Sequence, residues 1–495
     1  MTEHYDVIVV GAGLSGVGAG ARLLLDRPGT TFTVLEARET IGGTWDLFRY
    51  PGVRSDSDMH TLGYPFRPWT AGKALADGPS ILEYVEDTAR ELGVDRHVRL
   101  HHRVTKAAWS SEDARWTVTA ERTDTGESVE VTCGFLYSCT GYYRYDHGFE
   151  PEFEGRADYA GTVVHPQHWP ADLDLGGKRV VVIGSGATAM TLVPAIAQTA
   201  AHVTMLQRSP TYVAALPSVD PIAAAVRERL PAGAAYRVVR TKNIATSALS
   251  YRLSQRFPHA MRRILMDGVA KQLPEGYDVE THFGPSYGPW DQRLCVVPDG
   301  DLFTAISNGS ASVVTDRIAR FTREGLLLES GEELAADVVV TATGLELLLV
   351  GGMTLSVDGV DVDATKTVAY KGMMLTGVPS FAFAIGYTNA SWTLKCDLVS
   401  RYVVRLLDHL QEHGYDAVTP VDPPEPERLP LLDLSAGYVQ RAAGSLPAQG
   451  IRPPWKLNQN YRKDVALLTR GPLDDEGVRF TRRSLPRRPS GRHAT

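Results

Sequence analysis

The sequence predicts an α/β protein made of two Rossmann-like dinucleotide-binding domains, with a helical insertion in the second. A chain of 495 residues is too long for one ordinary core. A glycine-rich turn follows an apolar run at Gly11 and again 173 residues later, at Gly184. Each turn leads into a helical pattern and then into a second apolar run. This order is a βαβ unit, which implies a parallel sheet covered by helices.

The first turn, Gly11-Ala12-Gly13-Leu14-Ser15-Gly16, is a complete GxGxxG pattern behind the run "YDVIVV". Its glycines allow a tight turn, close approach to a pyrophosphate, and contact between helix and strand. The helix that follows offers free N–H groups and a positive dipole end to phosphates. Glu36 ends the second apolar run, where a carboxylate accepts hydrogen bonds from ribose hydroxyls. An unphosphorylated adenosine, such as that of FAD, fits this unit.

The second turn, with Gly184, Gly186 and Ala189, is the GxGxxA variant. Arg208 lies 24 residues after Gly184, in the place that Glu36 takes 25 residues after Gly11. A guanidinium there pairs with a 2′-phosphate, so Arg208 and the adjacent Ser209 favour NADPH. Two dinucleotide sites in one chain indicate a flavoprotein that passes a hydride from nicotinamide to flavin.

These motifs divide the chain. We expect a discontinuous FAD-binding domain at residues 1–150 and 340–495, and an NADPH-binding domain at residues 165–339. Between about residues 214 and 280 the spacing becomes helical and rich in Ala, Leu and Arg, which predicts the insertion.

Composition excludes several classes of function. A hydrophobic fraction of 43% and a charged fraction of 22% are typical of a globular protein. A net charge of −7 gives no reason to expect a nucleic-acid partner. The apolar stretch at residues 334–357 is interrupted by polar residues, so no transmembrane segment is expected. Four cysteines without a CxxC pair favour the reducing cytoplasm and argue against a disulfide reductase. The oligomeric state stays open.

A longer motif lies between the two turns. "YAGTVVHPQHWP", residues 159–170, is similar to the FxGxxxHxxxW fingerprint of Baeyer–Villiger monooxygenases, with Gly161, His165 and Trp169 in place and Tyr159 where the family usually has Phe. Related flavin-containing monooxygenases carry Phe or Tyr at the position of Trp169. For His165 we favour a structural role that couples the two domains.

The resemblance to this family of class B flavoprotein monooxygenases covers nearly the whole chain, and is closest to the actinobacterial branch that oxidises ketones and thioamides. The segment "GGTWDLFRYPGVRSDSDMHTLGYPFRPW", with Thr44, Trp45 and Asp56, resembles the family's flavin-flanking segment. "TATG", with Thr343 and Gly344, resembles a returning strand that closes the FAD site.

The same resemblance implies the catalytic residues. Asp56 matches the acid that orients the active-site arginine, which is Arg293 here. Many relatives have Lys before this arginine, contacting the 2′-phosphate; this chain has Gln292, which leaves Arg208 as the main phosphate ligand.

The implied reaction inserts one oxygen atom of O₂ into an organic ketone through a C4a-peroxyflavin, with sulfide or thioamide oxygenation beside it. Arg293 would favour the anionic peroxide and the negative oxygen of the adduct. Two alternatives stay open: an N- or S-oxygenating enzyme without ketone insertion, and a flavin-binding regulatory protein that has lost turnover. We also expect the helical insertion and the loops near Trp290 and Trp392 to line the substrate pocket.

Overall fold

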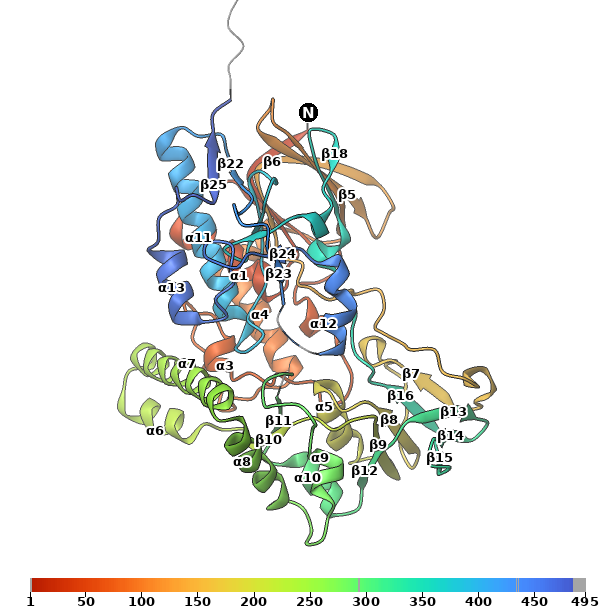
Figure 1. The fold of residues 1–495 in the computed structure, drawn as a ribbon. Coiled ribbons are helices and arrows are strands. Elements are labelled where there is room, and N and C mark those ends of the chain that lie inside the picture. The colour runs from red at the N-terminus through yellow and green to blue at the C-terminus, as the bar shows by residue number, and fades with distance from the viewer. Residues whose placement is uncertain (1, 293, 433, 435, 484–495) are drawn as a thin grey trace, which may run out of the picture.

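The computed structural model describes residues 2–292, 294–432, 434 and 436–483. Its two largest sheets are one of mixed strand direction and one of parallel strands, each beside its own helices (Figure 1). The predicted fold class, with Rossmann-like units, is confirmed by this architecture.

The first sheet has nine strands in the order β18-β17-β4-β5-β6-β1-β2-β3, and β21 also pairs with β6. The strands are β1 (Glu3–Val10), β2 (Phe32–Leu35), β3 (Val98–Arg99), β4 (His102–Ser110), β5 (Arg115–Arg122), β6 (Ser128–Ser138), β17 (Thr354–Val357), β18 (Val360–Asp361) and β21 (Phe381–Phe383). Strands β6, β1, β2 and β3 run parallel, whereas β4, β5 and β6 pair antiparallel.

Alternation along β1 builds a core on each face of this sheet. Val7 and Val9 join the cluster formed with α1 and α11, whereas Ile8 and Val10 join the cluster that contains Trp109. Successive side chains of a strand point to opposite faces, so one short apolar run is buried on both sides. The helices of this part are α1 (Leu14–Asp26), α2 (Thr44–Leu47), α3 (Met59–Leu62), α4 (Gly78–Leu92), α11 (Trp392–His413), α12 (Gly437–Ala442) and α13 (Tyr461–Thr469).

The second sheet has five parallel strands in the order β12-β9-β8-β16-β7. They are β7 (Thr162–Val164), β8 (Arg179–Ile183), β9 (His202–Gln207), β12 (Ala311–Thr315) and β16 (Val338–Thr341). Helices α5 (Ala187–Ile196) and α10 (Asp301–Ser307) pack on one face, and the antiparallel strands β13 (Ile318–Thr322), β14 (Gly325–Leu328) and β15 (Glu333–Ala335) pack on the other.

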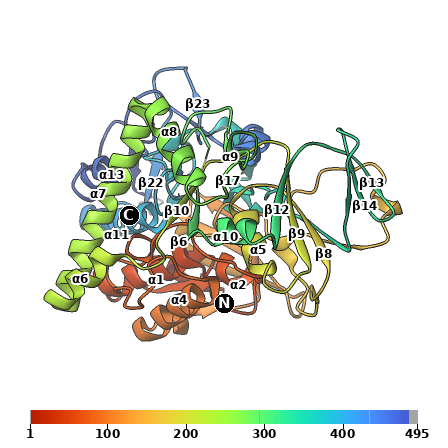
Figure 2. The ribbon, with the colours of Figure 1, turned by 90° about the horizontal axis from the view of Figure 1, so that it is seen from below.

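Four helices interrupt the second unit between β10 (Val213–Leu216) and β11 (Cys295–Pro298): α6 (Pro221–Arg229), α7 (Ala232–Arg256), α8 (Pro258–Ala270) and α9 (Val279–Phe283). Seen from below, α6, α7 and α8 form one end of the molecule (Figure 2). The smaller pairs are β19 (Ala369–Tyr370) with β20 (Met374–Leu375), β22 (Ala417–Pro420) with β25 (Val478–Thr481), and β23 (Leu429–Pro430) with β24 (Ala448–Gln449). Across the described ranges, no helix has the length and apolar character needed to cross a membrane.

The chain crosses between the two sheets twice, and the crossings are hydrogen-bonded to each other. Tyr143 and Leu347 form an antiparallel bridge, and the Leu348 N–H donates to the Tyr142 carbonyl at 2.9 Å. The N–H of Arg144 donates to the carbonyl of Glu346, whose carboxylate also pairs with the Arg144 guanidinium at 3.0 Å. The two sheets are therefore joined by a paired connection.

Candidate functional site

The first glycine turn is held by close backbone contacts. Gly11 has φ +98°, and its N–H donates to the Leu35 carbonyl at 2.8 Å. A Cβ on Gly11 would lie 2.8 Å from the Cys139 carbonyl oxygen, and a Cβ on Gly16 would lie 1.8 Å from the Gly11 oxygen. Gly13 caps α1 without a side-chain hydrogen bond, which leaves the N-terminal amides of the helix available to an anion.

Glu36 follows β2 and is buried beside this turn. One carboxylate oxygen accepts from the Ala12 N–H at 2.6 Å, and the other accepts from the Arg38 N–H at 2.9 Å. Burial raises the pKa of Glu36, and the backbone donors oppose that rise. Each carboxylate oxygen has a second lone pair, so Glu36 can still accept bonds from a ribose diol.

The second turn repeats the geometry of the first. Gly184 has φ +127°, and its N–H donates to the Leu206 carbonyl at 2.8 Å. A Cβ on Gly184 would lie 2.4 Å from the Ala342 carbonyl oxygen, just as one on Gly11 would meet Cys139. Gly186 caps α5, again without a side-chain bond. Each turn thus packs against the strand end of a neighbouring parallel strand, β6 or β16.

Arg208 and Ser209 lie just beyond β9, at the same edge of the second sheet as the turn. Both are exposed and line the same cavity as Gly184. The Ser185 hydroxyl donates to the Ser209 carbonyl at 3.1 Å, which ties this corner to the glycine turn. Among the described ion pairs, Arg208 has no carboxylate partner, so its charge is available to an anion.

One cavity of about 1020 Å³ reaches both turns. Its lining includes Gly11, Gly13 and Glu36 at one end, and Gly184, Gly186, Arg208 and Ser209 at the other. The "TATG" residues Thr343 and Gly344 also line it. This volume lies at the upper end of the range for ligand sites.

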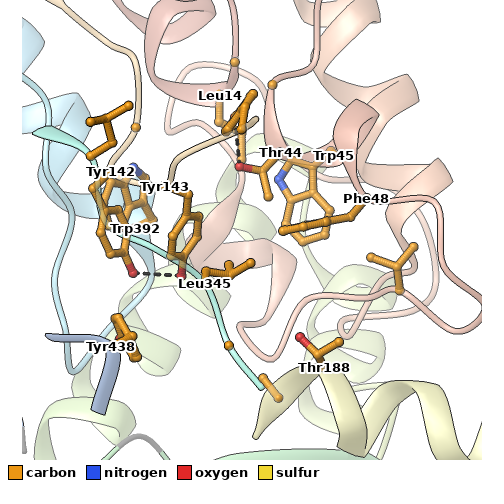
Figure 3. A pocket seen from close by; sticks show the side chains of 18 of the residues that line it. Leu14, Thr44, Trp45, Phe48, Tyr142, Tyr143, Thr188, Leu345, Trp392 and Tyr438 are labelled. Atoms are coloured by element: carbon orange, nitrogen blue, oxygen red, sulfur yellow. Dashed lines mark hydrogen bonds between the residues drawn. The ribbon is translucent and has the colours of Figure 1, made fainter. Parts of the chain in front are cut away.

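Aromatic side chains form opposite walls of the cavity (Figure 3). Trp392 stacks on Tyr142 with ring centroids 4.7 Å apart, and Tyr142 bonds through its hydroxyl to the Tyr143 hydroxyl at 2.9 Å. The Trp392 indole N–H donates to Ser15 Oγ at 3.2 Å, which attaches this wall to the first turn. Tyr438 lines the cavity on the same side.

The flavin-flanking segment forms the facing wall. Trp45 packs against the core of the second sheet and against the cluster formed by α1, α3 and α4, and the Thr44 hydroxyl is 3.1 Å from the Tyr145 hydroxyl. Asp56 is half-buried and lines the cavity, as does Gln292. Arg293, the expected catalytic arginine, lies outside the described residues.

The fingerprint residues lie beside the cavity, at the connection between the sheets. His165 Nε2 is 3.2 Å from the Gly344 carbonyl, and Nδ1 accepts from the Gln167 N–H at 3.2 Å. A Cβ on Gly161 would lie 2.7 Å from the Asp337 carbonyl oxygen, and Trp169 packs on the core of the second sheet. The role of Gly161, His165 and Trp169 in coupling the two domains stays a prediction.

One expectation about the pocket needs correction. No residue of the insertion between positions 214 and 280 is among the described residues that line the cavity. The loops near Trp290 and Trp392 do contribute Gln292 and Trp392, although Trp290 itself packs edge-on against Tyr251. The helical spacing indicates amphipathic helices, but it does not say which way they face. Gly16 and Ala189 also lie outside the lining and serve the turns through packing.

Sequence reasoning missed the aromatic wall at Tyr142 and Tyr143. A signal was available, because Cys139-Thr140-Gly141 follows β6 just as Ala342-Thr343-Gly344 follows β16. The repeated strand–Thr–Gly pattern identifies a second loop that lines the cavity.

The fold and the site together define a protein in which two dinucleotide-type turns share one cavity. A family model described as flavin-binding monooxygenase-like matches residues 74–412, and one for an NAD(P)-binding Rossmann-like domain matches residues 9–74. The chain belongs to the flavin-binding monooxygenase-like family and is a flavin-dependent monooxygenase.

Similar proteins cover the chain almost end to end. The FAD-containing monooxygenase EthA of Mycobacterium tuberculosis H37Rv is 54% identical, with 98% of this chain and 99% of EthA covered. The probable FAD-binding monooxygenase AlmA of Acinetobacter baylyi is 46% identical, with 98% and 97% covered.

Solved structures share the fold at low sequence identity. A steroid monooxygenase bound to NADP superposes with a TM-score of 0.77 at 23% identity, with 97% of this chain and all of that chain covered. A cyclohexanone monooxygenase superposes with a TM-score of 0.73 at 21% identity and the same coverage.

Proposed function

We propose that this enzyme binds FAD and NADPH and inserts one oxygen atom of O₂ into a ketone, giving an ester or lactone. NADPH supplies the two electrons, and the second oxygen atom leaves as water. The observation that carries the proposal is the cavity that joins Glu36 at one turn to Arg208 at the other, with Asp56 also in its lining.

The residues present fit FAD at the first turn. Free amides at the start of α1 suit a pyrophosphate, and the Glu36 carboxylate suits a ribose diol. Because Gly11 has no Cβ, its backbone can lie close to Cys139 and can approach the ligand. The residue ranges 1–150 and 340–495 form the FAD-binding domain in this proposal.

The second turn fits NADPH, with residues 165–339 as its domain. Arg208 is an exposed, carboxylate-free cation at the edge of the described cavity, and suits a 2′-phosphate. EthA and AlmA are named for FAD, and the steroid monooxygenase is described as bound to NADP, which supports both assignments.

When bound, the reduced flavin supplies the activation of O₂. The chain supplies the aromatic walls that exclude water and a cation for the negative charge that develops on the substrate oxygen. We assign that cation to Arg293 and its positioning to Asp56. Asp56 lines the cavity, and so does Gln292, the residue directly before Arg293 in the sequence.

The cysteines argue against a disulfide-reductase alternative. All four are free and buried, and burial raises the pKa of the Cys133 and Cys139 thiols. A thiol that stays protonated is a poor redox nucleophile. Free thiols also fit the cytoplasm, where we place the enzyme.

The test is to replace Arg293 by Ala and to follow product and NADPH together. We expect ketone oxygenation to fall by about 10²–10³-fold, because one preorganised charge contributes that much in a dry site. FAD should stay bound, and the remaining NADPH oxidation should yield hydrogen peroxide. Asp56→Ala should show a milder form of the same uncoupling.

A small sulfide, run in parallel, separates the alternatives. Sulfoxide without any ester from the wild-type enzyme would replace this proposal by N- or S-oxygenation. A protein that binds FAD but oxidises no NADPH with any substrate would instead be the regulatory protein. Near wild-type ester formation by Arg293→Ala would remove Arg293 from the mechanism.

A further inference from the structure

Exposed apolar side chains are concentrated in one part of the molecule. Of the eleven large apolar side chains that the described chain exposes, nine lie between residues 216 and 264, in and just before α6, α7 and α8. They are Leu216, Val219, Ile222, Leu230, Val238, Leu249, Leu253, Phe257 and Ile264. The other two, Leu25 and Val360, lie in the unit of the first sheet.

Several of these side chains share one side of α7. Val238, Leu249 and Leu253 are separated by eleven and four residues, which returns each to the same side of an α-helix. Phe257, just before α8, and Ile264, in the middle of α8, continue the apolar surface and are 54% and 61% exposed. Both views place α6, α7 and α8 together at one end of the molecule (Figures 1 and 2).

The same segment is strongly basic. Residues 216–264 contain nine Lys or Arg and two acidic residues, a net charge of +7 in a chain whose total is −7. Arg237, Arg252, Arg256 and Arg263 are exposed. None of these four is paired with a carboxylate in the described part of the chain.

The inner side of the insertion is bound to the segment around α3. Among the described residues, nothing covers the exposed apolar side chains on its outer side. Arg240 donates from Nη1 to the carbonyls of His60 and Gly63, each at 2.7 Å, and the Asn243 amide donates to Asp58 at 2.8 Å. These contacts fix α7 to the segment around α3. Since residues 216–264 do not line the described cavity, their apolar exposure is not explained by the active site.

We propose that this outer face, formed by the exposed apolar and basic residues of positions 216–264, docks on the surface of an anionic lipid bilayer. A helix with apolar side chains on one side and arginines beside them lies in the plane of a membrane interface. Anionic headgroups complement the exposed Arg237, Arg252, Arg256 and Arg263, which lie in a segment of net charge +7 within a chain of net charge −7. This surface role goes beyond the proposed reaction and does not depend on it.

The test is sedimentation of the full-length, FAD-loaded protein with vesicles. We expect binding to vesicles that contain phosphatidylglycerol, weak binding to pure phosphatidylcholine, and loss of binding as salt rises from about 0.05 to about 0.5 M. Replacing both Leu249 and Leu253 by Ser should weaken binding at least about tenfold, because the apolar area that enters the lipid is lost.

The chain offers a matched control. Leu25→Ser with Val360→Ser removes the two exposed apolar side chains outside this face and should leave vesicle binding unchanged. Arg252→Gln with Arg256→Gln should remove the preference for anionic lipid. Circular dichroism and FAD content confirm that each variant is folded.

Several results would overturn the proposal. They are the absence of vesicle binding by the wild-type protein at low salt, an equal loss in the control variant, or equal binding to neutral lipid. Sedimentation velocity without lipid tests the alternative that a second copy of this chain covers the face. If the wild-type protein self-associates and Leu249→Ser with Leu253→Ser dissociates it, the face is instead an interface between copies of this chain.

Discussion

Gly11 lies close against the backbone of Cys139 in the first turn. Replacing it by Ala would put a Cβ 2.8 Å from the Cys139 carbonyl oxygen, which real Cβ atoms do not tolerate, so the turn must shift. We expect Gly11→Ala to lose most of its FAD, because the displaced turn no longer presents its amides to the pyrophosphate. Flavin absorbance per chain in the purified protein measures this.

Gly29 provides the control for this variant. It has φ +94°, close to the +98° of Gly11, but nothing lies within 4 Å of its Cβ position. Both Ala variants therefore carry a similar backbone strain of about 1–2 kcal/mol, and only Gly11→Ala carries a clash. A similar loss of FAD in both variants would show that strain, and not the close contact, determines binding.

In contrast to Gly11, Arg208 is an exposed charged residue, and its effect on binding depends on which nucleotide is bound. We expect Arg208→Ala to raise the KM for NADPH by about ten- to a hundredfold and to leave the KM for NADH nearly unchanged, since one charge-assisted contact is worth about 1.5–3 kcal/mol. Arg320→Ala, an exposed arginine on β13 away from the described cavity, is the control. Equal effects on both nucleotides would exclude a phosphate contact.

At the scale of elements, the hydrogen bonds that hold segment 159–170 require His165 to be neutral. Nε2 must donate to the Gly344 carbonyl while Nδ1 accepts from Gln167, and a neutral imidazole has one donor and one acceptor. Burial lowers the pKa of His165. The unfolded chain therefore binds the proton more tightly, and stability is lost as pH falls below the ordinary histidine value of about 6.5.

His165→Asn tests this dependence. Above pH 7 we expect the variant to melt at a lower temperature than the wild type, because the bond to Gly344 is lost, at a cost of about 1 kcal/mol. The difference in Tm should shrink as pH falls from about 7.5 to about 5.5, since only the wild type has this proton to gain. A difference in Tm that stays constant with pH would exclude His165 as the titrating group.

The elements also show how far the sequence could predict the structure. The two glycine turns and their following helices were predictable because each is a local pattern in one continuous stretch. The loop near Trp392 was expected at the pocket and lines it, but the stacking of Trp392 on Tyr142 was not predictable, because packing brings these distant segments together. The insertion was predicted as helical, but its direction depends on contacts such as that of Arg240 with the carbonyls of residues 60–63, which helical spacing does not encode.

At the scale of the whole molecule, Arg54 joins the units of the two sheets. Its guanidinium donates to the Asp301 carboxylate at 2.5 Å, at the start of α10, and to the Met190 carbonyl of α5 at 3.2 Å. We expect Arg54→Met to cost about 1–2 kcal/mol of stability, because these bonds are partly exposed. Hydrogen exchange should rise on both sides of the contact, around residues 51–57 and 187–192, and mass spectrometry measures it.

Arg179→Met is the comparison for Arg54→Met. Arg179 pairs with Asp337 at 3.0 Å, but both residues belong to the second sheet's unit and are well exposed. Its loss should change exchange locally and leave residues 51–57 as they are. If both variants gave the same exchange pattern, Arg54 would not act between the two units.

The order of strands in the first sheet has a consequence for synthesis on the ribosome. The five strands of the second sheet come from one continuous stretch, residues 162–341, so this sheet can close as soon as that stretch has emerged. The first sheet includes β17, which pairs with β4, and β21, which pairs with β6, and both are made later. We therefore expect the middle of the chain to fold before its beginning is complete, with the edge of β4 open to other chains until residues 354–357 arrive.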